Sequence, residues 1–154
     1  ILQCTAVLAV LRVAWGWGRL AIAFAIVAVL TWGAELLGST TGIPFGAYHY
    51  TGALQPHLSG VPLLIPLAWM MMLAPSWAAA QAILGLPHTP RQRLQFAALV
   101  GLAMVAWDLY LDPQMVGWGF WVWEQPGAYF GIPLVNFVGW FIVAAHVSII
   151  DKSA

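Results

Sequence analysis

The sequence predicts an all-α fold, a polytopic bundle of transmembrane helices. Of the 154 residues, 62% are hydrophobic and 6% are charged, and the mean hydropathy is +0.87. Soluble domains carry about 25% charged residues, so a chain with so few charges could not cover its surface in water. Apolar runs close to the length of about 20 residues that a membrane-spanning helix needs recur along the chain. Loops rich in glycine, proline and aromatic residues separate them.

Four apolar runs are long enough to be full spans, and a fifth is partial. The full spans are predicted at residues 20–37, 61–86, 94–111 and 132–150. Residues 1–11 are too few to cross a membrane, so we expect them to be the end of a helix that begins before Ile1. The predicted unit is therefore a single transmembrane domain over residues 1–154 that lacks an N-terminal portion.

Two features predict departures from straight helices. Residues 12–19 contain Trp-Gly-Trp-Gly between two arginines, which is typical of a short turn at the membrane interface. The second full span contains Pro62, Pro66 and Pro75. Each of these prolines removes a backbone donor and clashes with the carbonyl one turn back, so we expect them to kink this helix.

The basic residues indicate how the chain crosses the membrane. All five fall on one predicted side: Arg12, Arg19, Arg91, Arg93 and Lys152. Loops 38–60 and 113–131 contain no lysine or arginine. Because cytoplasmic loops are enriched in these residues, the basic loops are predicted to be cytoplasmic and the two aromatic loops to face outward. This topology gathers four carboxylates near the outer face: Glu35, Asp108, Asp112 and Glu124.

The composition disfavours several classes of function. A formal net charge of zero argues against a nucleic-acid partner, which would bind mainly through positive charge. The single cysteine, Cys4, excludes an internal disulfide and a cysteine-based metal cluster. The scattered histidines and acids match no metal-ligand spacing, and no glycine-rich phosphate loop follows a predicted strand. We therefore expect neither a metal site nor a nucleotide cofactor.

Asp108 and Asp112 are unexpected in so apolar a sequence. At helical spacing they share one face, about 6 Å apart along the axis, with Asp108 about one turn inside the outer helix end. An ionised carboxylate in a membrane costs several kcal/mol unless it is paired or solvated, which favours a functional role. For Asp108 the alternative is a buried acid that is hydrogen-bonded to a neighbouring helix. For Asp112 the alternative is a turn, because Asp before Pro113 commonly starts one.

Glu35 is predicted two or three residues inside the outer end of its span. No basic residue is near it in sequence or on that side of the membrane. Burial without a cation favours the protonated form of a carboxyl group, and a second carboxylate nearby favours it further. Glu35 beside Asp108 would thus suit a neutral acid next to an ionised partner, the usual arrangement for general acid catalysis. The alternative is a glutamate at a helix end that reaches up to the headgroups.

Aromatic residues crowd the two outer loops, where they could line a pocket for a long apolar ligand or form an interfacial girdle. Glu124 could equally be a loop residue in that girdle, and Asn136 a contact between helices. The candidate binding residues are Tyr48, His49, Tyr50, Trp107, Trp121, Trp123, Glu124, Tyr129 and Asn136.

Four blocks of this sequence together are similar to one known family. They are ELLGSTTGIPFGAYHY at residues 35–50, Gly60-Val-Pro62, WDLYLDP at 107–113 and GAYFGIPLVNFVGW at 127–140. The combination resembles the CruF-type carotenoid biosynthesis family, which comprises membrane carotenoid hydratases of bacteria and haloarchaea. The resemblance runs from about Trp32 to Trp140. Family members tend to be longer, which fits the expected missing N-terminal portion.

The resemblance implies an enzyme, a hydro-lyase that adds water across the terminal 1,2 double bond of a carotenoid ψ-end to give a tertiary hydroxyl. For this reaction our hypothesis is that Asp108 or Glu35 is the acid, with Asp112 helping to position water, and that no cofactor is required. The implied partners are a long apolar carotenoid, the lipid bilayer of a prokaryotic cytoplasmic membrane, and other carotenoid-pathway or pigment-binding membrane proteins.

Two functions of other classes remain open from the sequence. One is a non-catalytic subunit that binds carotenoid within a larger membrane complex, such as a photosynthetic one; its acids could be neutralised without changing the pigment. The other is a proton-coupled transporter. A transporter needs a polar route to the cytoplasm, and the inner halves of the spans offer little beyond Gln81 and His146.

Overall fold

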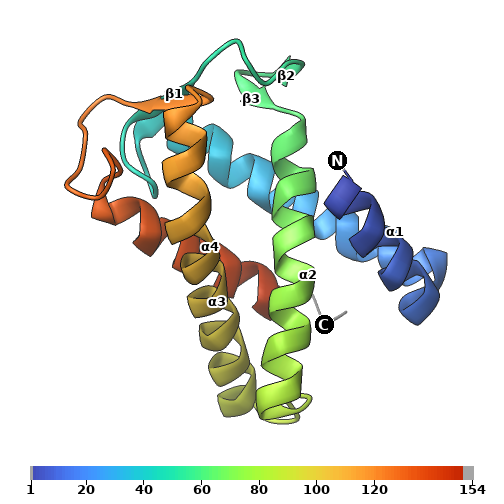
Figure 1. Cartoon of the computed structure of the whole chain (residues 1–154). Coiled ribbons are helices and arrows are strands. Elements are labelled where there is room, and N and C mark those ends of the chain that lie inside the picture. The colour runs from blue at the N-terminus through green and yellow to red at the C-terminus, as the bar shows by residue number, and fades with distance from the viewer. Residues whose placement is uncertain (1, 151–154) are drawn as a thin grey trace.

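The computed structural model describes residues 2–150, so Asp151 and Lys152 of the expected polar tail lie outside the described residues. The described chain is mostly helical. Its helices are α1 (Leu2–Thr41), α2 (Leu64–Leu84), α3 (Pro90–Gly117) and α4 (Leu134–Ile150). Figure 1 shows α2 and α3 side by side and antiparallel, with α4 crossing α3 and α1 packed against α2.

The helices have the composition of membrane spans. Within residues 2–150, α1, α2 and α3 are long and apolar enough to cross a membrane. The apolar helix α4 has 17 residues, the short end of the range of about 17–25 for a spanning helix. The prediction of an apolar helical bundle is confirmed, and the count of four full spans plus a partial helix stays a prediction.

A single glycine takes the place of the turn predicted at residues 12–19. The chain is helical on both sides of Gly16, whose φ of 74° and ψ of 171° break the helix sharply. Glycine adopts such a positive φ without a steric cost. The guanidinium of Arg12 stacks over Trp17 and that of Arg19 over Trp15, each at 4.8 Å from the ring centroid. The predicted position of the break is correct, but the break is a kink within a helix and not a turn.

Helix α3 corrects the predicted end of the third span at residue 111. The helix continues through Pro113 to Gly117, so the alternative interpretation of Asp112 as the start of a turn is wrong. Pro113 has no N–H, which leaves the carbonyl of Leu109 without its helical donor. Tyr129 Oη donates to that carbonyl at 2.9 Å. A residue from the loop between α3 and α4 thus supplies the missing hydrogen bond, and Asp108 lies deeper in the helix than predicted.

Helix α2 begins later than predicted. Val61–Pro62 form the short strand β3, and the helix starts at Leu64, so Pro62 lies outside it. Pro66 falls in the first turn, where a proline displaces no helical hydrogen bond. Pro75 lies inside the helix, which nevertheless continues to Leu84.

Loops 38–60 and 113–131 contain short strands that the all-α prediction missed. Strand β1 (Tyr48–Tyr50) pairs antiparallel with β4 (Trp121–Trp123), and β2 (His57–Leu58) pairs with β3. In the first pair Tyr48 lies opposite Trp123 and Tyr50 opposite Trp121. Since successive side chains of a strand point to opposite faces, all four aromatic rings lie on one face of this ribbon.

Phe45 anchors the loop between α1 and α2 to the helices. Its side chain is 1% exposed. A Cβ added to Gly139 of α4 would lie 2.7 Å from Phe45 Cδ1 and 2.8 Å from the carbonyl oxygen of Pro44. A Cβ added to Gly38 of α1 would lie 2.6 Å from Phe45 Cδ2. Glycine at both positions lets the loop approach both helices, which fixes β1 above the bundle.

Candidate active site

A small cavity lies at the end of the bundle beneath the ribbon of β1 and β4. Its volume is about 40 Å³. Its polar wall consists of Glu35, Tyr48, Tyr50, Asp112 and Asn136. The rest of the wall is mainly aromatic and includes Phe45, Trp69, Trp121, Trp123 and Trp140. One water needs about 10–15 Å³, so this cavity has room for water next to carboxyl groups.

Glu35 is held by three side chains of the described structure. Tyr48 Oη donates to Glu35 Oε2 at 2.5 Å, and Tyr50 Oη donates to the same oxygen at 2.7 Å. Trp69 Nε1 donates to Oε1 at 3.0 Å. The carboxyl group is 5% exposed. Both of its oxygens therefore accept hydrogen bonds, the pattern that suits a carboxylate anion.

The two tyrosines are held in their donor form. Burial raises the pKa of Tyr48 well above its usual range, and the charge of Glu35 raises it further. The same two causes, in the same order, raise the pKa of Tyr50. A tyrosine with a raised pKa keeps its O–H proton at all ordinary pH values. The alternation of β1 directs both hydroxyl groups to Glu35.

Asp108 and Asp112 are joined by one amide. Asn136, in the first turn of α4, donates from Nδ2 to Asp108 Oδ2 at 2.9 Å and to Asp112 Oδ2 at 2.6 Å. The three side chains are at most 2% exposed. The hydrogen bond between Asp108 and a neighbouring helix is the contact that a purely structural role requires. The buried Oδ1 of Asp108 has no hydrogen-bond partner within residues 2–150.

The three candidate acids come together as the topology predicted, at different distances from the cavity. Glu35 and Asp112 line it directly. Asp108 does not line it and reaches it through Asn136 and Asp112. The helix continues past Pro113, so Asp112 projects from a regular turn of α3 toward α4.

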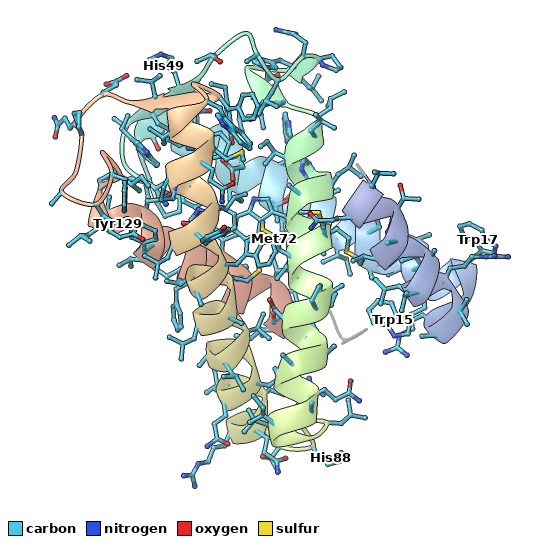
Figure 2. The ribbon with its side chains drawn as sticks, viewed as in Figure 1. Trp15, Trp17, His49, Met72, His88 and Tyr129 are labelled. Atoms are coloured by element: carbon cyan, nitrogen blue, oxygen red, sulfur yellow. The ribbon has the colours of Figure 1, made fainter. Side chains whose placement is uncertain are left out.

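Four of the predicted binding residues lie outside the cavity. His49 and Glu124 are exposed, and Figure 2 shows His49 at the outer edge of the molecule. Successive side chains of β1 point to opposite faces, so His49 points outward because its neighbours Tyr48 and Tyr50 point inward. Trp107 is 44% exposed and lines a different hollow. Tyr129 contacts the cavity only indirectly, through the backbone of α3.

Sequence reasoning missed the stacked pair Trp69 and Trp140. Their ring centroids are 4.2 Å apart with an interplanar angle of 14°, and Trp69 binds Glu35. Both residues lie in predicted spans. The predicted topology puts Trp69 in the outer half of its span, near the level of Glu35, and that placement was the available signal.

Comparison with known proteins gives one family. A family model described as "Carotenoid biosynthesis protein" matches residues 1–153. The chain is 30% identical over 125 residues to a protein of Haloarcula japonica named bisanhydrobacterioruberin hydratase, an alignment that covers 80% of this chain and 42% of the relative. The chain thus spans less than half the length of that relative. No solved structure matches it. From the match along almost its whole length, the chain belongs to the carotenoid biosynthesis protein family.

Proposed function

We propose that this chain hydrates a carotenoid, adding water across the terminal 1,2 double bond of a ψ-end to leave a tertiary hydroxyl. The observation that carries the proposal is the water-sized cavity walled by two carboxyl groups and several aromatic rings. A hydration reaction needs a proton donor, a water molecule and a stabiliser of positive charge in one place. The name of the Haloarcula japonica relative, a hydratase, supports the same reaction class.

The aspartate pair is the proposed proton donor. Two carboxylates bound to one amide repel each other, and a single proton held between them relieves that repulsion. Asp112 faces the cavity and Asp108 lies behind it, so we assign proton delivery to Asp112 and the storage of the shared proton to Asp108. This assignment differs from the expectation that Asp108 or Glu35 delivers the proton, because Asp112 is the aspartate with access to a substrate.

The reaction then balances without a redox partner. The proton forms a bond to C2 of the double bond and leaves a tertiary cation at C1. Water attacks C1 through its oxygen, and the proton that this water loses returns to the aspartate pair. The aspartate pair thus regains the proton that it gave, and no cofactor is consumed.

Glu35 is the proposed stabiliser of the cation. Three donors hold it as an anion on the cavity wall, and an anion opposes positive charge strongly in a low-dielectric site. The faces of Trp121, Trp123 and Trp140 line the same space. Each aromatic face in contact with a cation contributes about 0.5–2 kcal/mol.

The proposal includes an orientation in the membrane. Arg91 and Arg93 lie in the first turn of α3, at the end of the bundle far from the strands; Figure 2 marks these two ends with His88 and His49. By the positive-inside rule, the arginines face the cytoplasm of a prokaryotic cell and the cavity lies near the outer face. In this arrangement each of the four helices crosses the membrane.

The test is the pigment profile of a host that makes an acyclic carotenoid, with and without this chain. Hydration predicts products heavier by one water, or by two when both ends react. A non-catalytic carotenoid-binding subunit predicts unchanged pigment masses and pigment that co-purifies with the protein. Unchanged masses with abundant, membrane-inserted protein would overturn the hydratase proposal.

A further inference from the structure

A second, larger hollow lies beside the cavity. It is about 380 Å³ in volume and runs between the first half of α1, α2 and α3. Val7, Pro75, Ala103 and Trp107 are among its walls, and none of the described residues that line it is charged. We call this hollow the apolar groove. Small side chains create its space, since alanines line it on both α2 and α3.

Met72 connects the apolar groove to the cavity. Its side chain lines both spaces, and it is 4% exposed. Figure 2 shows it near the centre of the bundle, at α2. Methionine has three rotatable bonds and adapts to irregular gaps. A rotation of this one side chain would therefore change the wall between the groove and the acids.

We propose that the apolar groove binds the polyene chain of the substrate, whose end group passes Met72 to reach Asp112. This inference rests on the proposed function and adds the site for the unreactive part of the substrate. The cavity alone, at about 40 Å³, holds water and part of an end group. A long hydrocarbon chain must lie elsewhere, and the groove adjoins the cavity at Met72.

The dimensions and chemistry of the groove fit an extended apolar chain. Cavity and groove together follow α2 from Ile65 to Ala79, about 21 Å at 1.5 Å per residue. Trp107, which binds nothing in the cavity, offers a half-exposed ring along this path. Burial of apolar surface is proportional to area, so a long chain gains more from the groove than a short one does.

The test compares two substrates with the same terminal double bond, a full-length acyclic carotenoid and a short acyclic isoprenoid. Ala103→Phe and Ala79→Phe each fill the groove from a different helix. Ala106→Phe is the matched control, because Ala106 is exposed and lines neither space. We expect the groove variants to hydrate the carotenoid about tenfold more slowly or worse, the effect of overfilling a packed site. Hydration of the short isoprenoid should stay as in the control.

The amounts of carotenoid and phospholipid that co-purify with each variant give a second measurement. Loss of carotenoid from both groove variants but not from the control supports the proposal, even if no hydration is detected in any sample. Equal retention and equal rates in all three variants would overturn it. Loss of phospholipid with carotenoid unchanged would make the groove a lipid site and would also overturn it. If wild-type protein retains carotenoid and hydrates nothing, the hydratase proposal fails and the groove survives.

Discussion

At the residue scale, the carboxyl groups of the site form two different hydrogen-bonding arrangements. Glu35 accepts hydrogen bonds on both oxygens, whereas Asp108 and Asp112 share one amide and Asp108 keeps an unpaired oxygen within the described residues. In the proposed mechanism the first arrangement supplies a fixed anion and the second supplies a shared proton. The sequence located all three acids, but their different partners come from loops and helices far along the chain.

Asp112→Asn tests the assigned proton donor. The amide keeps the shape of the side chain and cannot deliver a proton, so hydration should fall by about 10²–10⁴-fold, the usual contribution of a general acid. Carotenoid products are measured by mass spectrometry, and the amount of protein in the membrane is the control. Undiminished hydration would remove Asp112 from the mechanism.

Tyr48 and Tyr50 should titrate abnormally. Their folded-state pKa values are raised by burial and by Glu35, so near a pH of about 10, where the tyrosines of an unfolded chain ionise, both remain protonated. The folded state then binds more protons than the unfolded state. The stability that this provides is complete below pH of about 10 and is lost as pH rises above it. Tyrosinate absorbance in detergent should reveal the two only on unfolding. Ionisation of either one near a pH of about 10 in the folded protein would contradict their hydrogen bonds to Glu35.

At the scale of elements, α3 stays continuous beside the site although it contains a proline, because a loop tyrosine replaces the hydrogen bond that the proline removes. Pro113 frees the carbonyl of Leu109, and Tyr129 caps it from outside the helix. The sequence left a turn at Asp112–Pro113 open as an alternative, because it contains no information about which distant group will satisfy a freed carbonyl. The consequence for function is that Asp112 is a helical residue with a fixed direction.

A double-mutant cycle measures how far the hydroxyl group of Tyr129 replaces the backbone N–H that Pro113 lacks. Tyr129→Phe alone should destabilise the fold by about 0.5–1.5 kcal/mol through its lost hydrogen bond. In the Pro113→Ala background the helix regains its own N–H donor, so the same change should cost less. Thermal unfolding in detergent gives both values. Equal costs in the two backgrounds would show that Tyr129 does not compensate for the proline.

Gly139→Ala tests the close contact between α4 and the loop that joins α1 to α2. The added Cβ would collide with Phe45 and with the Pro44 carbonyl, which should cost about 1–3 kcal/mol and disturb β1. Gly33→Ala is the matched control on α1, because a Cβ there meets nothing within 4 Å. A lower unfolding temperature is expected for Gly139→Ala and not for Gly33→Ala. Equal stability of the two variants would contradict the tight packing.

At the scale of the whole molecule, the sequence predicted the apolar helical bundle and the convergence of Glu35 with the aspartates. Hydropathy and the distribution of charge carry that information, since each depends on local composition. The pairing of β1 with β4, the role of Trp69 and the outward direction of His49 depend on contacts between distant segments. Spacing along one segment cannot supply them.

The origin of the hydroxyl oxygen tests the hydratase proposal most directly. Wild-type protein in detergent would be incubated with an acyclic carotenoid in water labelled with heavy oxygen, without added cofactor, with Asp112→Asn as the parallel sample. Hydration predicts a tertiary alcohol that carries the heavy oxygen, formed by wild-type protein and much less by the variant. An alcohol without the label, or no alcohol from folded protein that retains the carotenoid, would contradict it.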